Sequence, residues 1–466
     1  MGTERRDDGS RDVRVCVDLG STFTKAAAVD VRGAQLLATA QSRTTIDTDV
    51  ADGLDAVLTD LSAGGTSQAA PGYADVLACS SAGGGLRLAV VGYERAITAE
   101  AGYRVGLSAG ARVEHVSSGP LDDAELARLT GSRPDVLLLV GGTDGGNAEV
   151  LLHKARALAR SRLGVPVVVA GNADVADEVR RILRRTGQPV RVTANVLPRI
   201  GVLDPRPARE AIREVFIRHV IGGKHLSRRV DLTTLVRAAT PDAVLAGVEV
   251  LADEVGDVVL VDVGGATTDV YSVVSPDPDA PSWEADPVGT LWRSRTVEGD
   301  LGVRWNATGI VEAALVERLV AADEAERLGR AAVALAADPG RVPTTQDERD
   351  VDVRLATLAA TVALRRHARP HVSGGVQQPG KDLRRVSLVV GSGGVFRHAG
   401  EGGDDPDGRA AQEMLRACLS DLAGGWRLPE RAAVVVDRRY VMAAAGTLAA
   451  EHPEAARGLV RTLLPG

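Results

Sequence analysis

Two short segments of the chain carry residues that could bind a polyphosphate: residues 15–30 (VCVDLGSTFTKAAAVD) and residues 258–274 (VVLVDVGGATTDVYSVV). Each is an apolar run, then an Asp, a glycine-containing turn with Ser or Thr, and a second apolar run, a pattern typical of a β-hairpin. Glycine permits close approach and unusual dihedral angles, so backbone N–H groups and hydroxyls at such a tip can surround phosphate oxygens. The predicted cradles are Gly20, Ser21 and Thr22 in the first hairpin, and Gly264, Gly265, Thr267 and Thr268 in the second.

A carboxylate in each hairpin, and a lysine in the first, complete these segments. Asp18 and Asp262 end the first apolar runs and could hold the water shell of Mg²⁺, which keeps several waters and takes few carboxylates. Lys25 follows Asp18 by seven residues and is one of only four lysines in the chain. Its compact ammonium would be a point-charge partner for a phosphate. Either segment alone could be an ordinary hairpin with a polar turn, but two in order favour ATP and Mg²⁺ as ligands.

Strands and helices alternate around these motifs. Residues 13–42 alternate apolar and small or polar positions and predict three antiparallel strands, followed by a helix over 49–62. From residue 112 to 196, strands with continuous apolar runs alternate with helices, which indicates a parallel sheet covered on both faces. Further helices are predicted around 307–335 and 349–368. The two hairpins suggest a duplicated half-domain.

The composition narrows the class of protein. A length of 466 residues exceeds what one hydrophobic core usually supports, so we expect two or more domains. The net charge of −7 and the aromatic share of 3% argue against a nucleic-acid partner, which needs phosphate neutralisation and base stacking. The N-terminus is polar, and no apolar run reaches transmembrane length. We therefore expect a cytoplasmic protein without a membrane partner.

The two hairpins, with the late glycine-rich run VSLVVGSGGVFR (386–397), resemble the way in which actin, Hsp70 chaperones and sugar kinases hold ATP. This resemblance implies a two-lobed α/β fold of the actin-like ATPase (ribonuclease H-like) type, with the nucleotide cleft between the lobes. It implies that the glycines of the late run lie flat against the base and ribose. The residues matching this adenosine loop are Gly391, Ser392, Gly393 and Gly394.

The same resemblance gives a role to the segment TVEGDLGVR. Hsp70 chaperones carry a similar segment whose loop approaches the terminal phosphate, so Glu298 or Asp300 could orient the attacking water. The alternative is that Asp300 caps a helix, as Asp often does. The candidate catalytic residues are therefore Asp18, Asp262, Glu298 and Asp300.

The resemblance also suggests a division of the chain. We expect a disordered N-terminus over 1–12 and a first lobe with an additional α/β segment over 13–200. A second lobe would follow over 201–430. Residues 431–466 would form a C-terminal strand and a helix that returns to the first lobe.

Longer segments throughout the chain resemble the glutamate mutase L (MutL, GlmL) family. They are CSSAGGGLRLAVVGYERAITAEAG, LLLVGGTDGGN, VPVVVAGNADV, TANVLPRIGVLDPRPAREAIREVFIRHVIGGKHLS, DVGGATTDVYSV, TVEGDLGVR and VVGSGGVFRH. This resemblance implies a slowly hydrolysing ATPase that reactivates an adenosylcobalamin-dependent mutase and is not itself the mutase. The alternatives are a small-molecule kinase of the acetate or sugar kinase type and an actin-like scaffold protein.

Two glycine clusters, at 80–90 and 137–147, follow predicted strands, where parallel sheets bind ligands. Neither fits the dinucleotide-binding fingerprint, and both are interpreted as turns whose role stays open.

Overall fold

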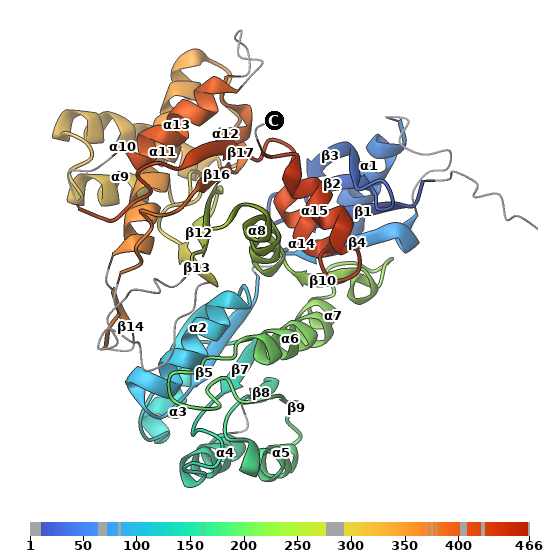
Figure 1. The fold of residues 1–466 in the computed structure, drawn as a ribbon, viewed down its shortest axis with the longest axis vertical. Coiled ribbons are helices and arrows are strands. Elements are labelled where there is room, and N and C mark those ends of the chain that lie inside the picture. The colour runs from blue at the N-terminus through green and yellow to red at the C-terminus, as the bar shows by residue number, and fades with distance from the viewer. Residues whose placement is uncertain are drawn as a thin grey trace, which may run out of the picture.

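Three five-stranded sheets organise the chain (Figure 1). The computed structural model describes residues 11–63, 72–82, 85–161, 163–275, 293–369, 371–373, 376–378, 380–400, 408–420 and 425–464. Most of the predicted disordered N-terminus, residues 1–10, lies outside the described residues.

The first sheet has the order β10-β4-β1-β2-β3. The predicted antiparallel strands are confirmed as β1 (Val13–Leu19), β2 (Phe23–Asp30) and β3 (Gln35–Arg43). Strand β4 (Val76–Ser80) runs parallel to β1, and β10 (Val236–Ala239) runs parallel to β4. The predicted helix after β3 is α1 (Val50–Ala63), which packs its apolar side chains against this sheet.

The second sheet repeats this arrangement in the order β13-β12-β11-β16-β17. Its strands are β11 (Val258–Val263), β12 (Thr268–Val273), β13 (Arg293–Glu298), β16 (Leu388–Ser392) and β17 (Ala433–Val436). The first three are antiparallel, and β16 and β17 follow in parallel, as β4 and β10 do in the first sheet. Equal order and direction in both sheets confirm the two-lobed, actin-like fold and its duplicated half-domain.

Helices complete the second lobe. They are α9 (Ala307–Val316), α10 (Ala322–Ala337), α11 (Gln346–Ala368), α12 (Gly394–His398) and α13 (Arg409–Leu419). A two-stranded sheet of β14 (His371–Ser373) and β15 (Val376–Gln378) follows α11. Apolar side chains of β11, α11 and α13 share one buried cluster, so α11 and α13 cover this face of the sheet.

The third sheet is inserted between β4 and β10 and is entirely parallel, as the sequence predicts. Its order is β6-β5-β7-β8-β9, formed by β5 (Arg87–Val91), β6 (Arg112–Ser117), β7 (Val136–Leu139), β8 (Val167–Val169) and β9 (Val190–Val192). Helices α3 (Asp123–Gly131), α4 (Glu149–Ser161) and α5 (Ala176–Arg184) cover one face. Helices α2 (Glu100–Ser108) and α6 (Arg206–Val215) cover the other.

This insertion shifts the division of the chain. The sequence analysis begins the second lobe at residue 201, yet β10 at 236–239 still pairs within the first sheet. Similarly, the C-terminal strand β17 pairs with β16 of the second sheet, and the chain leaves that sheet only afterwards. A strand's sheet is decided by its distant partner, which the local sequence pattern does not contain.

Two helices join the lobes: α8 (Thr240–Val255) follows β10, and α14 (Val441–Leu448) follows β17 (Figure 1). They pack very closely, because a Cβ at Gly247 would lie 2.1 Å from the Met442 carbonyl oxygen. The last helix, α15 (Pro453–Arg461), packs beside them. One hydrophobic cluster contains side chains of both sheets and of this helix pair, including Val29, Leu260, Tyr271, Leu245 and Met442.

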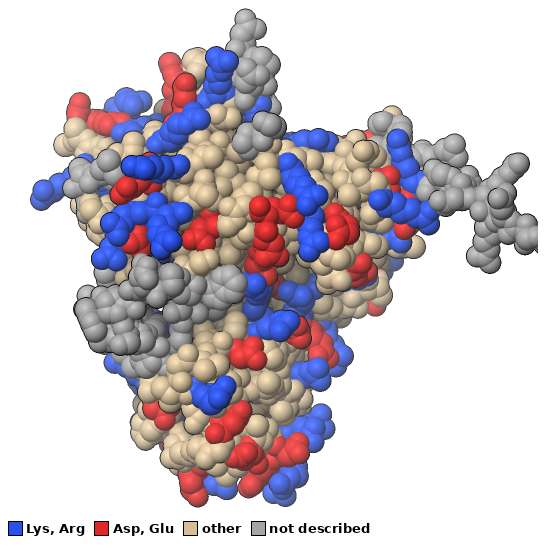
Figure 2. Space-filling view, viewed as in Figure 1, with Lys and Arg blue, Asp and Glu red and all other residues tan. Residues whose placement is uncertain are grey.

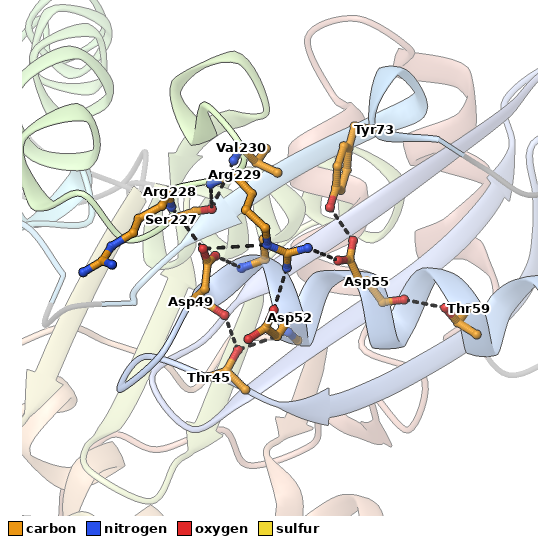
Figure 3. A network of polar contacts seen from close by, with 12 residues as sticks. Thr45, Asp49, Asp52, Asp55, Thr59, Tyr73, Ser227, Arg228, Arg229 and Val230 are labelled. Carbon is orange, nitrogen blue, oxygen red and sulfur yellow. Dashed lines mark hydrogen bonds and ion pairs between the residues drawn. The ribbon is translucent and has the colours of Figure 1, made fainter.

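An ion-pair network holds the chain that returns from the insertion. Short helix α7 (Gly222–Lys224) leads to a loop in which Arg229 contacts Asp49, Asp52 and Asp55 at the start of α1 (Figure 3). The side chain of Asp49 also accepts a hydrogen bond from the backbone N–H of Arg228 at 3.0 Å. The loop before β10 is thereby fixed to the first lobe.

On the face drawn in Figure 2, basic and acidic side chains are interspersed. Ion pairs at the surface include Arg461 with Glu254 at 2.7 Å, which links α15 to α8. Exposed pairs of this kind each contribute little to stability.

Candidate functional site

The two hairpin tips have the same backbone geometry. The Gly20 N–H donates to the Phe23 carbonyl at 3.2 Å, and the Gly264 N–H donates to the Thr267 carbonyl at 2.9 Å. Strand register is equivalent as well, since Asp18 lies opposite Lys25 and Asp262 lies opposite Asp269. Ser21 and Thr22 are exposed at the first tip, where their hydroxyls are accessible.

Each tip carboxylate receives hydrogen bonds from neighbouring strands or helices. The Thr240 hydroxyl, at the start of α8, donates to Asp18 Oδ1 at 2.6 Å, and the Cys79 thiol of β4 lies 3.7 Å from the same oxygen. In the second lobe, Ser392 is opposite Asp262 in the β11–β16 pairing and hydrogen-bonds to its carboxylate. The parallel strand beside each hairpin thus supplies a small polar side chain that orients the acid.

Lys25 is half-buried where the two hairpins meet. Burial opposes its charge, but Tyr440, Asp18 and Asp262 together raise the pKa of its ammonium above the ordinary value. One of these carboxylates belongs to each lobe. The structure therefore brings Asp18, Lys25 and Asp262 to a single place, although Asp18 and Asp262 are 244 residues apart in the chain.

The surroundings of the second carboxylate, Asp262, disfavour its ionised form. Burial, assisted by the nearby charges of Asp269 and Asp18, raises the pKa of Asp262 to about 6, even though Lys25 lowers it. Asp269 itself pairs with Arg295 at 2.9 Å and accepts a hydrogen bond from Thr267. Asp269 is thus held by its neighbours within the second lobe.

The late glycine-rich run packs against the end of β11. Gly393 has a φ of +106°, and a Cβ there would lie 2.2 Å from the Val263 carbonyl oxygen, so no other residue fits. A Cβ at Gly394 would meet no described atom within 4 Å, which leaves this position open. With Ser392 bonded to Asp262, residues 391–394, where β16 passes into α12, lie directly beside the second hairpin.

The loop that follows β13 is bonded to the second hairpin tip. Thr268 is fully buried, and its hydroxyl donates to the Leu301 carbonyl at 2.7 Å. The Val303 N–H donates to the Gly264 carbonyl, and the Arg304 and Trp305 N–H groups donate to the Gly265 carbonyl. The Thr268 hydroxyl therefore anchors this loop in the structure, while Gly264 and Gly265 lie at the contact between loop and tip.

The two acidic residues of this loop share one arginine. Arg366 of α11 donates to Glu298 at 2.7 Å and to both oxygens of Asp300 at 2.8 and 2.9 Å. Burial raises the pKa of Glu298, against the effect of Arg366. Helix α9 begins after Asn306, so the alternative of Asp300 as the cap of this helix is not the arrangement found.

Two residues of the C-terminal segment complete the site and were missed by the sequence analysis. Asp437 directly follows β17, is buried, and accepts hydrogen bonds from the Val441 and Met442 N–H groups at 2.9 and 3.1 Å. Tyr440 places its ring 3.8 Å from Lys25 Nζ. The signal for Asp437 was present, because VVVD repeats the apolar run ending in Asp of both hairpins.

The glycine cluster at 137–147 belongs to the inserted domain. Asn195 donates to Gly142 O and to Asp144 Oδ1, and Asp144 also accepts from the Ala173 N–H. The loop after β7 is thus bonded to the loops after β8 and β9. Of the cluster at 80–90, residues 83–84 lie outside the described residues.

Two sheets of identical topology, with acidic hairpin tips that meet at one lysine, define a protein of the actin-like ATPase fold. The chain belongs to the MutL protein family, the glutamate mutase L family, whose model matches residues 14–464. It is 36% identical to Protein MutL of Clostridium tetanomorphum over 468 residues, which cover 97% of this chain and 99% of that protein.

Solved structures with a similar arrangement include nucleotide-free acetone carboxylase, at 17% identity and a TM-score of 0.41 over 94% of this chain and 70% of that one. Xylulose kinase from Bifidobacterium adolescentis gives 12% identity and a TM-score of 0.31 over 96% and 93%. The ethanolamine utilization protein EutJ from Carboxydothermus hydrogenoformans gives 11% and 0.25 over 96% and 89%.

Across the described part of the chain, no helix combines the length and apolar character needed to cross a bilayer.

Proposed function

We propose that this chain binds Mg-ATP where the two hairpins meet. The observation that carries the proposal is the convergence of Asp18, Lys25 and Asp262. The lysine could bind phosphates, and the two carboxylates could hold a hydrated metal ion. Gly20, Ser21 and Thr22, with Gly264, Gly265 and Thr267, would surround the phosphates. Loop 391–394 would lie against the adenosine.

The residues fit a magnesium ion held through its waters. Lys25 alone does not offset the cost of ionising the half-buried Asp262 carboxyl, whose pKa is about 6, and a nearby divalent ion would add positive charge. Within the described residues, no group of three or more His, Cys, Asp or Glu could hold a metal directly. Magnesium that keeps its waters needs fewer direct ligands than such a group provides.

Replacement of Lys25 by Ala should weaken Mg-ATP binding by about 10- to 100-fold, because a desolvated, charge-assisted contact to phosphate is lost. Lys25→Arg should restore little of it, since a planar fork does not fit the place of a compact ammonium. Calorimetric titration with Mg-ATP measures both variants. Wild-type affinity in Lys25→Ala would contradict the phosphate role of Lys25.

We further propose that the bound ATP is hydrolysed slowly. Glu298 and Asp300 are the candidate residues for orienting the attacking water, and both are paired with Arg366. Against the effect of burial, Arg366 holds the pKa of Asp300 below its ordinary value, which makes this carboxylate a weak base, so its turnover role would wait for the pair to rearrange. Asp300→Asn and Glu298→Gln should then bind ATP but hydrolyse it more slowly than the wild type.

Hydrolysis would serve to reactivate an adenosylcobalamin-dependent mutase. Membership of the MutL family supports this proposal. Open and closed lobes would present different surfaces to the mutase, and nucleotide can shift that equilibrium only through its different affinity for the two states.

The test uses an adenosylcobalamin-dependent mutase from the same organism, inactivated by turnover. Adding this chain with Mg-ATP and fresh coenzyme should restore mutase activity, and Asp300→Asn should bind the mutase but restore little. No recovery, together with no nucleotide-dependent association, would reject the reactivase proposal. Stoichiometric phosphorylation of a small molecule would instead favour the kinase alternative, and ATP-dependent sedimentation the scaffold.

A further inference from the structure

The ring of Tyr440 contacts two cations that come from different lobes. Lys25 Nζ, from the first hairpin, lies 3.8 Å from the ring centroid, and Arg397 Cζ, from α12 of the second lobe, lies 4.6 Å from it. Both distances are within the range of a cation–π contact. Arg397 also donates to Gln41 of β3 at 3.1 Å, so this group of side chains bridges the lobes.

The backbone of Tyr440 is unusual at the same point. Its φ of 53° and ψ of 39° lie in the left-handed region. Gly and Asn adopt this conformation readily, whereas bulky residues such as Tyr seldom do. Tyr440 directly precedes α14, and Asp437 accepts hydrogen bonds from the first N–H groups of that helix. Such outliers persist where the surroundings hold them and are found at switch regions and ligand sites.

Lys25 is half-buried, and the Tyr440 ring, 3.8 Å from Nζ, covers one side of its ammonium. A phosphate that approaches from that side must displace the ring. Three groups around it favour its charge: the carboxylates of Asp18 and Asp262, and the phenol of Tyr440, which hydrogen-bonds to the ammonium and has its ring centroid 3.8 Å from Nζ. The two carboxylates are the residues proposed to hold hydrated magnesium and would remain. The ring is the uncharged member of the three, and its place is the one that a phosphate oxygen can take.

We propose that Tyr440 is a clasp on Lys25 that the phosphates of the nucleotide must open, and hence a positioning residue for phosphate binding. This inference rests on the proposed binding of Mg-ATP. Opening would move the residue that begins α14, the helix that packs against α8 between the lobes. Phosphate occupancy would thereby be transmitted to the helix pair that joins them.

The test compares Tyr440→Asn with Tyr440→Phe. Asn tolerates the left-handed backbone but removes the ring, whereas Phe keeps a ring that can hold both cations. Calorimetry should find Mg-ATP binding about three- to tenfold tighter in Tyr440→Asn, because Lys25 no longer has to leave the ring. Tyr440→Phe keeps the ring but loses the hydroxyl that hydrogen-bonds to Lys25, so its affinity should lie between those of the wild type and Tyr440→Asn. Adenosine, which has no phosphate, should bind all three proteins equally.

A second measurement needs no nucleotide. Reductive methylation followed by mass spectrometry reports how accessible the Lys25 amine is, and the three other lysines serve as internal references. Lys25 should react faster in Tyr440→Asn than in the wild type or Tyr440→Phe.

The clasp would be overturned by Mg-ATP binding that is unchanged or weaker in Tyr440→Asn, or by an unchanged reactivity of Lys25. Failure of the proposed function looks different, because then the wild type and both variants bind no Mg-ATP at all. Tighter binding of adenosine as well as Mg-ATP would also refute the clasp, since the effect would not come from the phosphates.

Discussion

Replacing Asp262 by Asn should make the folded protein more stable and at the same time weaken its binding of Mg-ATP by about 10- to 100-fold. The gain in stability follows from burial, which raises the pKa of this carboxyl to about 6 from an ordinary value of 3.8. At neutral pH the ionised group is therefore less favourable in the folded state than in the unfolded chain. Asn is neutral and similar in shape, so the variant avoids the free-energy cost of an ionised carboxylate at this position.

The stability gain should depend on pH in a defined way. A carboxyl with a raised folded pKa takes up a proton more readily in the folded state, so its contribution to stability falls as pH rises from about 4 to about 6. Asp262→Asn should then be more stable by about 1–3 kcal/mol at pH 7 to 8, the lower end reflecting partial contact of this side chain with water. Below pH 4 the difference should vanish.

Urea denaturation without nucleotide, repeated across this pH range, measures the effect. The matched control is Asp269→Asn on the opposite strand, because Asp269 faces Asp262 in the register but pairs with buried Arg295. Removing that carboxylate leaves a buried guanidinium unpaired and should destabilise the protein by about 3–5 kcal/mol. Equal effects of the two substitutions would refute the distinction between a ligand-binding acid and a structural one.

Replacing Gly446 by Ala should destabilise the junction between the lobes by about 3 kcal/mol or more. A Cβ at this position in α14 would lie 1.7 Å from the Ala243 carbonyl oxygen and 2.7 Å from the Gly247 nitrogen of α8. Both are backbone atoms and cannot rotate away as a side chain could. The two helices must therefore separate, although Ala is the better helix former.

Gly329 in α10 provides the control, because a Cβ there would meet no described atom within 4 Å. The same substitution at Gly329 should stabilise the protein slightly, by about 0.5–1 kcal/mol, through helix propensity alone. Thermal unfolding of both variants measures the two changes in stability. A Gly446→Ala protein as stable as the wild type would mean that close contact between α8 and α14 is not required.

Local sequence was enough to predict both hairpins and most regular elements. The register that sets Asp18 opposite Lys25, and Asp262 opposite Asp269, follows from a short turn between two apolar runs, all within one segment. The continuous apolar strands of the insertion likewise predicted a parallel sheet, since side chains buried on both faces leave no polar alternation. Such features depend on neighbours a few residues away.

The sequence alone did not show to which sheet β10 belongs, or which residues Arg366 and Tyr440 contact. Helix α11 carries Arg366 to Glu298 across 68 residues, and Tyr440 meets Lys25 across 415. These contacts depend on how separate elements pack, and residue types alone do not specify which distant side chains meet. The amino-acid sequence determined where acids, glycines and a lysine would stand on hairpins. Only the tertiary structure decided that both hairpins converge on that lysine and that an aromatic ring covers it, because convergence is a property of the packed lobes.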